Sequence, residues 1–338
     1  MKLLCYADLQ ATDGDELCFT RPNTTLQHYR VEKFFDDVAR IYAENDCDAV
    51  VDLGDTTDDR SSIPLPTLEV LGAGIAKVPD GSHWKITGNH EQYLRDASVN
   101  NRRLFEHRFH VVDDKRIQMM GDWAAFFVSY PANHAELSEW LVKETRRIRA
   151  PKVLFGHFQV EGSYYQTGQA LTGIPQAVLK DFSLVMLGHI HLPQSVTPKI
   201  HYVGSPFQQD WGEVGQPKRV GIVNTNTMKV EWVPMTGYPE YRLVPLDEFE
   251  KVADESSEHR YRVSLNSHEE AERFFRHPHF NRATAQYNYD ETPAEQSTEN
   301  QDWSFEGTCR RYLKMVPPSR VGIEMTDEEM LEVTQHVI

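Results

Sequence analysis

The stretch Leu184-Val185-Met186-Leu187-Gly188-His189-Ile190-His191 joins an apolar run to a glycine and two histidines. The apolar run is typical of a buried strand, and the glycine allows the chain to turn where that strand ends. Residues within a strand alternate between its faces, but beyond the turn both imidazoles can face one point. Because imidazole is the commonest metal ligand in proteins, this stretch predicts a metal centre at a strand end.

The composition is that of a globular protein. The 338 residues suffice for one large core of about 200–250 residues and a smaller unit. The net charge of −16 argues against non-specific coating of nucleic acid, since binding to phosphates draws on a basic surface. Much of the negative charge lies between Thr236 and Ile338, which contain 21 acidic and 11 basic residues. The acidity therefore does not exclude an enzyme that handles phosphate.

Three features predict a cytoplasmic protein. The N-terminus reaches Asp8 too early for a signal peptide, and no apolar run approaches the roughly 18 residues of a membrane helix. The four cysteines lack the spacing of a metal site or a disulfide framework, which fits a reducing compartment.

The first 235 residues alternate between strand-like and helical patterns, which predicts an α/β fold. Residues 3–7 and 48–53 are predicted as buried strands, and apolar positions at helical spacing over 25–45 lie between them. This order favours a parallel crossover unit. Further strands are expected at 83–87, 124–128, 152–155, 184–187, 200–203, 219–223 and 229–234, and further helices at 66–76 and 135–149.

The pattern changes beyond about residue 240. Strands at 261–265 and 282–289, with a helix at 267–275 between them, predict a small α+β module. Residues 290–302 are polar and acidic, as in a mobile linker. The capping-box pattern Thr326-Asp327-Glu328-Glu329 predicts a terminal helix with an apolar face.

Five predicted strands end in a small or polar turn, followed by a side chain that can bind a metal. In open α/β sheets such side chains gather outside the carboxyl ends of the strands. Mixed oxygen and nitrogen donors suit Mn²⁺, Fe²⁺ or Zn²⁺, and the lack of cysteine argues against a structural zinc site. The side chains concerned are Asp8, Gln10, Asp55, Asn89, His90, His157, His189 and His191.

These turns resemble the ordered motifs of the calcineurin-like metallophosphoesterases over about residues 1–235. The motifs are Asp8-Leu9-Gln10, Gly54-Asp55, Gly88-Asn89-His90-Glu91, Gly156-His157 and Gly188-His189-Ile190-His191. Residues 181–191, followed by Tyr202-Val203-Gly204-Ser205-Pro206, are similar to the SbcD family, the nuclease subunits of a double-strand-break repair complex in bacteria and phages.

The resemblance implies three parts of the chain. Residues 1–238 would form an α+β sandwich of two packed mixed sheets flanked by helices. Residues 239–292 would form a capping module that contacts DNA. Residues 293–338 would carry a linker and a helix that docks on an SbcC-like coiled-coil ATPase; packing of this helix on its own core is the alternative.

The resemblance also implies two divalent ions, Mn²⁺ or else Mg²⁺. One ion would be held by Asp8, Gln10, Asp55 and His191. The other would be held by Asp55, Asn89, His157 and His189, with Asp55 as the bridge. Paired ions about 3.5–4 Å apart stabilise both the attacking and the leaving oxygen of a phosphoryl displacement.

Two residues beside the ions receive roles from the resemblance. His90 would stabilise charge on the phosphate and protonate the leaving 3′ oxygen. Asp58 would support His90, although an aspartate in a polar turn is commonly just solvated. A supporting histidine without a proton-transfer role is the alternative for His90.

The chain departs from the family at Gln10, where most relatives have histidine. A glutamine oxygen is a harder and weaker donor than imidazole, so we expect a looser first site with a stronger dependence on added Mn²⁺. The alternative is that Gln10 does not coordinate.

A basic cluster follows the Asn89-His90 turn, where a DNA backbone could lie. The alternative is the solvated face of a helix. Its residues are Arg102, Arg103, His107, Arg108 and His110.

The sequence thus predicts a two-metal DNA nuclease, an SbcD-like subunit that cuts duplex ends and single strands. DNA, an SbcC-like ATPase and a second copy of the chain are its expected partners, in a bacterial host if the chain is phage-encoded. One alternative is a phosphatase or cyclic-nucleotide phosphodiesterase of the same superfamily. The other is a non-catalytic scaffold for the ATPase.

Overall fold

A computed structural model describes residues 1–14, 16–94, 98–254 and 258–288. Residues Met1–Asn288 form one compact unit, which contains two six-stranded sheets and a three-stranded sheet. The predicted linker at 290–302 and the predicted terminal helix lie outside the described residues. None of the helices in the described ranges is long and apolar enough to span a membrane.

The first sheet is mixed, and its central strands are parallel. Leu3 of β1 pairs with Ala49 of β2, and helix α1 (Leu26–Glu44) connects these strands, which confirms the predicted crossover unit. In spatial order the strands are β12 (Lys229–Pro234), β11 (Arg219–Asn224), β1 (Lys2–Tyr6), β2 (Ala49–Asp52), β3 (His83–Ile86) and β4 (Phe109–Val112).

The second sheet is also mixed, and its register places two of the predicted ligand turns side by side. His157 at the end of β7 pairs with Gly188 at the end of β8. In spatial order the strands are β5 (Lys115–Met120), β6 (Trp123–Val128), β7 (Lys152–His157), β8 (Leu184–Gly188), β10 (Ile200–Tyr202) and β9 (Gln194–Thr197).

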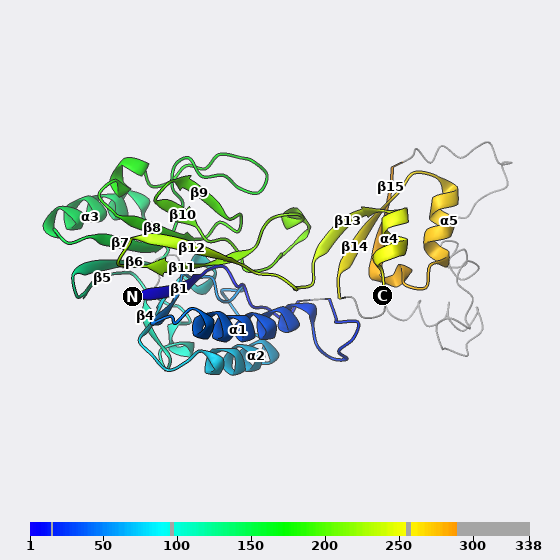
Figure 1. The fold of residues 1–338 in the computed structure, drawn as a ribbon, viewed down its shortest axis with the longest axis horizontal. Helices are drawn as coiled ribbons and strands as arrows, with labels where there is room; N and C mark the ends of the chain where they lie inside the picture. The colour runs from blue at the N-terminus through cyan, green and yellow to red at the C-terminus, as the bar shows by residue number, and fades with distance from the viewer. Residues whose placement is uncertain (15, 95–97, 255–257, 289–338) are drawn as a thin grey trace. The chain divides into compact units, whose positions relative to one another are not determined.

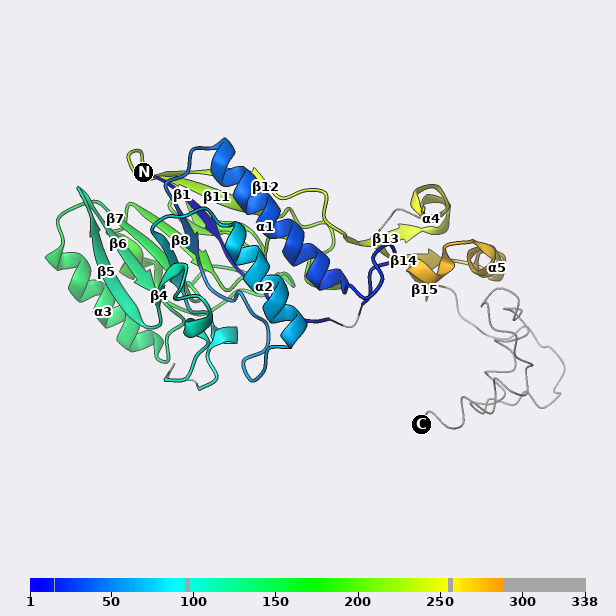
Figure 2. The same cartoon turned by 90° about the horizontal axis from the view of Figure 1, so that it is seen from below.

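Apolar side chains fill three layers around these sheets. Leu3 and Val51 of the first sheet pack with Phe127 and Phe155 of the second, so the sheets lie face to face. Helices α1 and α2 (Leu65–Lys77) cover the outer face of the first sheet, and α3 (His134–Arg147) covers the second (Figures 1 and 2). This confirms the predicted two packed mixed sheets flanked by helices.

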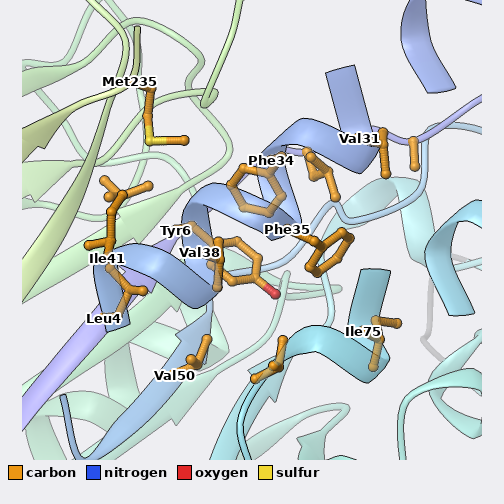
Figure 3. Packing of buried hydrophobic residues seen from close by; sticks show 14 of the residues in the cluster. Leu4, Tyr6, Val31, Phe34, Phe35, Val38, Ile41, Val50, Ile75 and Met235 are labelled. Carbon is orange, nitrogen blue, oxygen red and sulfur yellow. The ribbon is translucent and has the colours of Figure 1, made fainter. Parts of the chain in front are cut away.

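Helix α1 forms where the sequence combines a capping residue with helical apolar spacing. The Thr25 side chain caps the helix by accepting a hydrogen bond from the His28 amide. Phe34, Phe35 and Val38 then point into the cluster beneath the helix (Figure 3). This packing fixes α1 beside the chain that leaves β1 for the predicted metal centre.

The module after residue 238 has three parallel strands, β13 (Tyr241–Pro245), β14 (Arg260–Leu265) and β15 (Ala283–Tyr287). Helix α4 (Leu246–Val252) joins the first two strands, and α5 (His268–Arg276) lies between the last two. The predicted strand–helix–strand order of β14, α5 and β15 is confirmed. We did not predict β13 or α4, and the domain boundaries at 238 and 292 stay predictions.

Short strands account for the other differences from the sequence analysis. Strands β4, β5 and β9 were not predicted, because their short sequences mix polar and apolar residues without a clear period. The side chains of Arg102, Arg103, His107 and His110 in the basic cluster are exposed, as the alternative of a solvated face expects, but the cluster does not lie on one regular helix. Arg102–Leu104 form one short 3-10 turn, and Phe109–Val112 form strand β4.

Candidate metal centre

The turns with the predicted ligands meet at one edge of the two sheets. The Asp8 amide donates to the Gly54 carbonyl over 3.0 Å, and the Gln10 amide donates to the Asp55 carbonyl over 2.8 Å. The chain beyond β1 therefore runs beside the chain beyond β2. The second sheet contributes β7 and β8, whose ends are in register.

Three predicted ligands form a compact donor group. One ligand atom each from Asp55, His157 and His189 lies within 4.8 Å of the others. Asp55 and His157 are buried, and His189 is partly buried. One carboxylate and two imidazoles at this spacing could hold a divalent ion.

The hydrogen bonds of His157 indicate whether the donor group of Asp55, His157 and His189 suits a cation. Its Nδ1 lies 2.6 Å from the Leu53 carbonyl and donates to it, which leaves Nε2 directed at the Asp55 carboxylate at 3.1 Å. Without a proton on it, Nε2 is a buried nitrogen with no hydrogen-bond partner. Two electron-rich atoms that face each other in the interior suit a metal ion between them.

In the absence of metal a proton takes this position. Burial alone would lower the pKa of His157, but the Asp55 carboxylate raises it to about 9. Burial opposes the charge on Asp55 in turn, and His157 nevertheless lowers the Asp55 pKa below its usual range. Metal binding must displace this proton, so it releases protons to the solvent.

His189 is neutral at ordinary pH, the form in which histidine binds metals. Burial lowers its pKa to about 3, and the neighbouring His157 acts in the same direction. Its Nδ1 lies 2.7 Å from the Asn89 side-chain oxygen, and its Nε2 lies 3.1 Å from the Gln159 amide nitrogen. The structure therefore brings Asn89 to the same group of side chains.

Asp8 lies under the turn that carries His189. Its carboxylate accepts from the His189 amide at 2.9 and 3.1 Å. Burial raises the pKa of Asp8 to about 6, although His157 and His191 favour its charged form. A bound cation would favour that form further.

His191 is oriented by a buried carboxylate that the sequence analysis missed. Its Nδ1 lies 2.7 Å from Glu213, so it donates there and leaves Nε2 available for a metal. The other Glu213 oxygen accepts from Lys218 at 2.5 Å and from Ser205 at 3.1 Å. Burial would raise the pKa of Glu213, but His191 and Lys218 lower it to about 2, so the carboxylate is charged.

We expect Glu213→Gln to weaken the binding of one of two Mn²⁺ ions by about 10–100-fold, because His191 loses the acceptor that orients it. Calorimetric titration of the purified protein with Mn²⁺ measures this directly. The exposed Glu136→Gln on α3 is the matched control. Equal affinity in Glu213→Gln and the control would contradict this role of Glu213.

Gln10 and His191 both line an open cavity of about 260 Å³. Its carbonyl accepts from the Gln27 side chain at 3.1 Å. The backbone of Gln10 is thus held in place. Whether its side chain ligates stays a prediction.

His90 lies beside these groups and contacts Asp58. Its amide donates to the Asp55 carboxylate over 2.8 Å, which ties its loop to the predicted bridging residue. Its Nδ1 lies 2.5 Å from the Asp58 carbonyl and 3.3 Å from the Asp58 carboxylate. The Asp58 carboxylate raises the pKa of His90 to about 9, although partial burial acts against it. A histidine with this pKa is protonated at neutral pH and can act as an acid.

Asp58→Asn should move the alkaline limb of the pH–rate profile to lower pH. The raised pKa keeps His90 protonated up to about pH 9, so removal of the carboxylate that raises it brings deprotonation to lower pH. Steady-state rates from pH 6 to 10 measure the shift, with Asp59→Asn in the same loop as the control. An unchanged alkaline limb would contradict the role of Asp58.

Backbone strain marks the site, a signal that side-chain type alone does not reveal. Seven non-glycine residues among those described have positive φ, and four are predicted ligands. Such conformations persist only where the surrounding structure enforces them, commonly at functional sites. The four are Asp8 (54°), Gln10 (46°), Asp55 (55°) and His189 (88°).

Two glycines allow the turns to approach each other. A Cβ on Gly88 would lie 2.1 Å from the Asp55 carboxylate oxygen. Gly54 has φ +93°, and a Cβ there would lie 2.7 Å from Nδ1 of His157. Any side chain at either position would displace a predicted ligand.

Glu91 is a second positioning carboxylate that the sequence analysis missed. It accepts from the amides of Gly88 at 2.9 Å and Thr56 at 3.1 Å, so it joins the Asp55 and Asn89 turns. Lys85 neutralises it at 2.7 Å in the buried interior. The sequence feature that could have revealed this buried carboxylate is Lys85, a lysine within the buried strand β3, because a buried lysine needs an acidic partner.

The basic cluster is largely neutralised by nearby acids. Arg102 pairs with Asp113 and Glu106, and Arg108 pairs with Asp80. Arg103 is exposed. A role of Arg102, Arg103 and Arg108 in DNA binding stays a prediction.

A two-sheet sandwich with carboxylates and imidazoles at one edge defines a metal-dependent phosphoesterase. Residues 1–193 match the family described as calcineurin-like phosphoesterase, and the chain belongs to this family. Members hold two divalent metals, and the Asp55, His157 and His189 group is one place for an ion.

One curated relative is exonuclease subunit 1 of Enterobacteria phage T4, which is 22% identical over 196 residues. The match covers 54% of this chain and 55% of that protein, so the chain spans about half the length of the relative. This relative supports the resemblance to SbcD-type nucleases.

Similar solved structures include a dimetal phosphatase from Danio rerio, with a TM-score of 0.41 and 11% identity over 70% of this chain and 99% of that one. An archaeal phosphodiesterase has a TM-score of 0.35 and 10% identity over 69% and 99%. Likeness at this level supports no inference about the chemistry.

Proposed function

We propose that this protein is a DNA nuclease that depends on two divalent metals, most readily Mn²⁺, and acts as an SbcD-like subunit of a repair complex. The observation that carries the nuclease assignment is the match, over 196 residues, to a phage exonuclease subunit. It would cut duplex DNA from its ends and single strands internally.

The proposal gives each side chain of the site a role. Asp8, Gln10, Asp55 and His191 would hold one ion, and Asp55, Asn89, His157 and His189 the other. When bound, the ions supply positive charge that stabilises the attacking and leaving oxygens. His90, held by Asp58, would donate a proton to the leaving 3′ oxygen of the DNA strand.

The proposal also includes partners. An SbcC-like ATPase would bind the segment 293–338, and two copies of the chain would assemble with it in the cytoplasm of a bacterial host. The relative named above is itself a subunit, which supports an assembly. The parts 1–238, 239–292 and 293–338 are the proposed nuclease, capping and partner-binding regions.

The test compares substrates with one protein preparation and Mn²⁺. Linear duplex DNA, circular single-stranded DNA and bis(p-nitrophenyl) phosphate separate the alternatives. A nuclease degrades both DNAs, whereas a phosphatase or cyclic-nucleotide phosphodiesterase hydrolyses small esters and leaves DNA intact. A scaffold without catalysis hydrolyses none of them. Either of the last two results would overturn the proposal.

Gln10→His should tighten the binding of one Mn²⁺ ion by about tenfold or more and lower the Mn²⁺ concentration needed for activity, because imidazole is the better donor. Mn²⁺ titration by calorimetry measures the affinity. Gln159→His, beside the other predicted ion, is the comparison variant. Unchanged affinity in Gln10→His would show that residue 10 does not coordinate.

A further inference from the structure

A second cavity, of about 380 Å³, is lined by His90 and by none of the predicted metal ligands. Its walls combine an aromatic ring, aliphatic side chains and one arginine. We define this leaving-side pocket by His90, Arg60, Tyr93, Val99 and Leu104. None of these residues other than His90 has a role in the mechanism proposed above.

The apolar walls of the leaving-side pocket are exposed. Tyr93 is 57% exposed, Val99 49% and Leu104 37%. Apolar groups that gather on the surface beside a reactive residue commonly mark a binding site. Three such residues around one cavity at His90 are therefore a candidate contact for substrate.

The backbone that carries the exposed Tyr93 ring is held in place by hydrogen bonds. The Tyr93 amide donates to the Val99 carbonyl over 2.9 Å, which pairs the two flanks of the loop. Gln92 donates to the Tyr130 carbonyl over 2.9 Å, and Asn101 donates to the Thr57 hydroxyl over 2.9 Å. Because the loop backbone is already ordered, less conformational entropy is lost when a ligand packs on the ring.

The charge of the pocket suits a nucleotide. Arg60 is exposed and, among the described residues, forms no ion pair, in contrast to Arg102 and Arg108 of the basic cluster. Asp59 also lines the cavity, but it accepts hydrogen bonds from Ser61 and Ser62 of its own turn. A free guanidinium beside an aromatic wall can bind a phosphate while the wall stacks on a base.

We propose that the leaving-side pocket binds the nucleoside whose 3′ oxygen leaves, with its base stacked on Tyr93. This inference rests on the proposed function, because it takes His90 as the donor to the leaving oxygen. The leaving nucleoside then lies on the His90 side of the scissile phosphate, where this cavity is. Stacking on a tyrosine accepts all four bases, so the pocket fits a nuclease without sequence preference.

The test uses nucleotides as inhibitors of bis(p-nitrophenyl) phosphate hydrolysis by the Mn²⁺-loaded protein. Deoxyadenosine 3′-monophosphate carries its base on the leaving side, and the 5′-monophosphate carries it on the opposite side. Tyr93→Ala should weaken inhibition by the 3′-monophosphate about tenfold and leave inhibition by the 5′-monophosphate and by inorganic phosphate within about twofold. Tyr93→Trp should restore the parent value, because it restores a stacking surface.

The controls separate this inference from the proposed function. Met119→Ala, at an apolar residue on β5 that is 50% exposed, should change nothing. Equal inhibition of the parent and Tyr93→Ala by the 3′-monophosphate would overturn the pocket, as would a loss confined to the 5′-monophosphate. Failure of the parent to degrade DNA would overturn the nuclease assignment instead, and the inhibition series would still decide whether the pocket binds a nucleoside.

Discussion

Replacing Asp55 with asparagine is expected to lower phosphodiesterase activity by about a thousandfold or more. Asp55 is the predicted bridge between two ions, and an amide carries no charge to hold both. A loss of several kcal/mol of charge stabilisation corresponds to this factor. Hydrolysis of bis(p-nitrophenyl) phosphate at saturating Mn²⁺ measures it.

The Asp55→Asn experiment needs two further measurements. Asp114→Asn, whose side chain is 73% exposed, is the control for loss of one carboxylate. Calorimetry should show fewer bound Mn²⁺ ions in Asp55→Asn, since the donor group loses its carboxylate. If the variant kept the activity of the parent, the metal mechanism would have to be abandoned.

Replacing His90 with glutamine is expected to affect DNA and an activated ester unequally. The leaving 3′ oxygen of DNA needs a proton, and loss of a general acid costs about 10²–10⁴-fold in rate. p-Nitrophenolate is stable as an anion and needs no proton, so the loss on bis(p-nitrophenyl) phosphate should stay below about tenfold. Single-turnover rates on both substrates measure the difference.

His90 is not a predicted ligand, so Mn²⁺ binding should be unchanged in His90→Gln. This separates it from the other histidines of the site, such as His157, whose replacement should weaken metal binding. Equal losses on both substrates would contradict proton donation by His90. They would indicate that the His90 side chain only holds the loop in place, through its contact with Asp58.

Much of the fold follows from periodicity. The parallel crossover from β1 through α1 to β2 can be predicted from the sequence, because the buried strands are almost purely apolar and the helix between them has a regular apolar face. Strands β4, β5 and β9 cannot be predicted in the same way. They lie at sheet edges, where polar residues are tolerated and the apolar pattern of a buried strand is lost. Their assignment depends on pairing with neighbours distant in the sequence.

For the metal centre, the sequence by itself determined the candidate ligands, since donor side chains directly after buried strands form a local pattern. Gly188-His189-Ile190-His191 needed no coordinates to be singled out. Only the tertiary structure decided which groups orient these ligands. Glu213 orients His191, and Glu91 joins its own turn to the Asp55 turn through Thr56, so each contact links segments that are separated along the chain.

The leaving-side pocket was likewise decided by tertiary structure. Tyr93 and Leu104 are unremarkable in the sequence, and they become a candidate site because the fold leaves them exposed around a cavity at His90. Which side chains can bind a metal follows from residue type and from position after a buried strand, and both can be read from the sequence. The orientation of the ligands and the shape of the pocket depend on contacts between segments that are distant in the sequence, and only the tertiary structure shows these contacts.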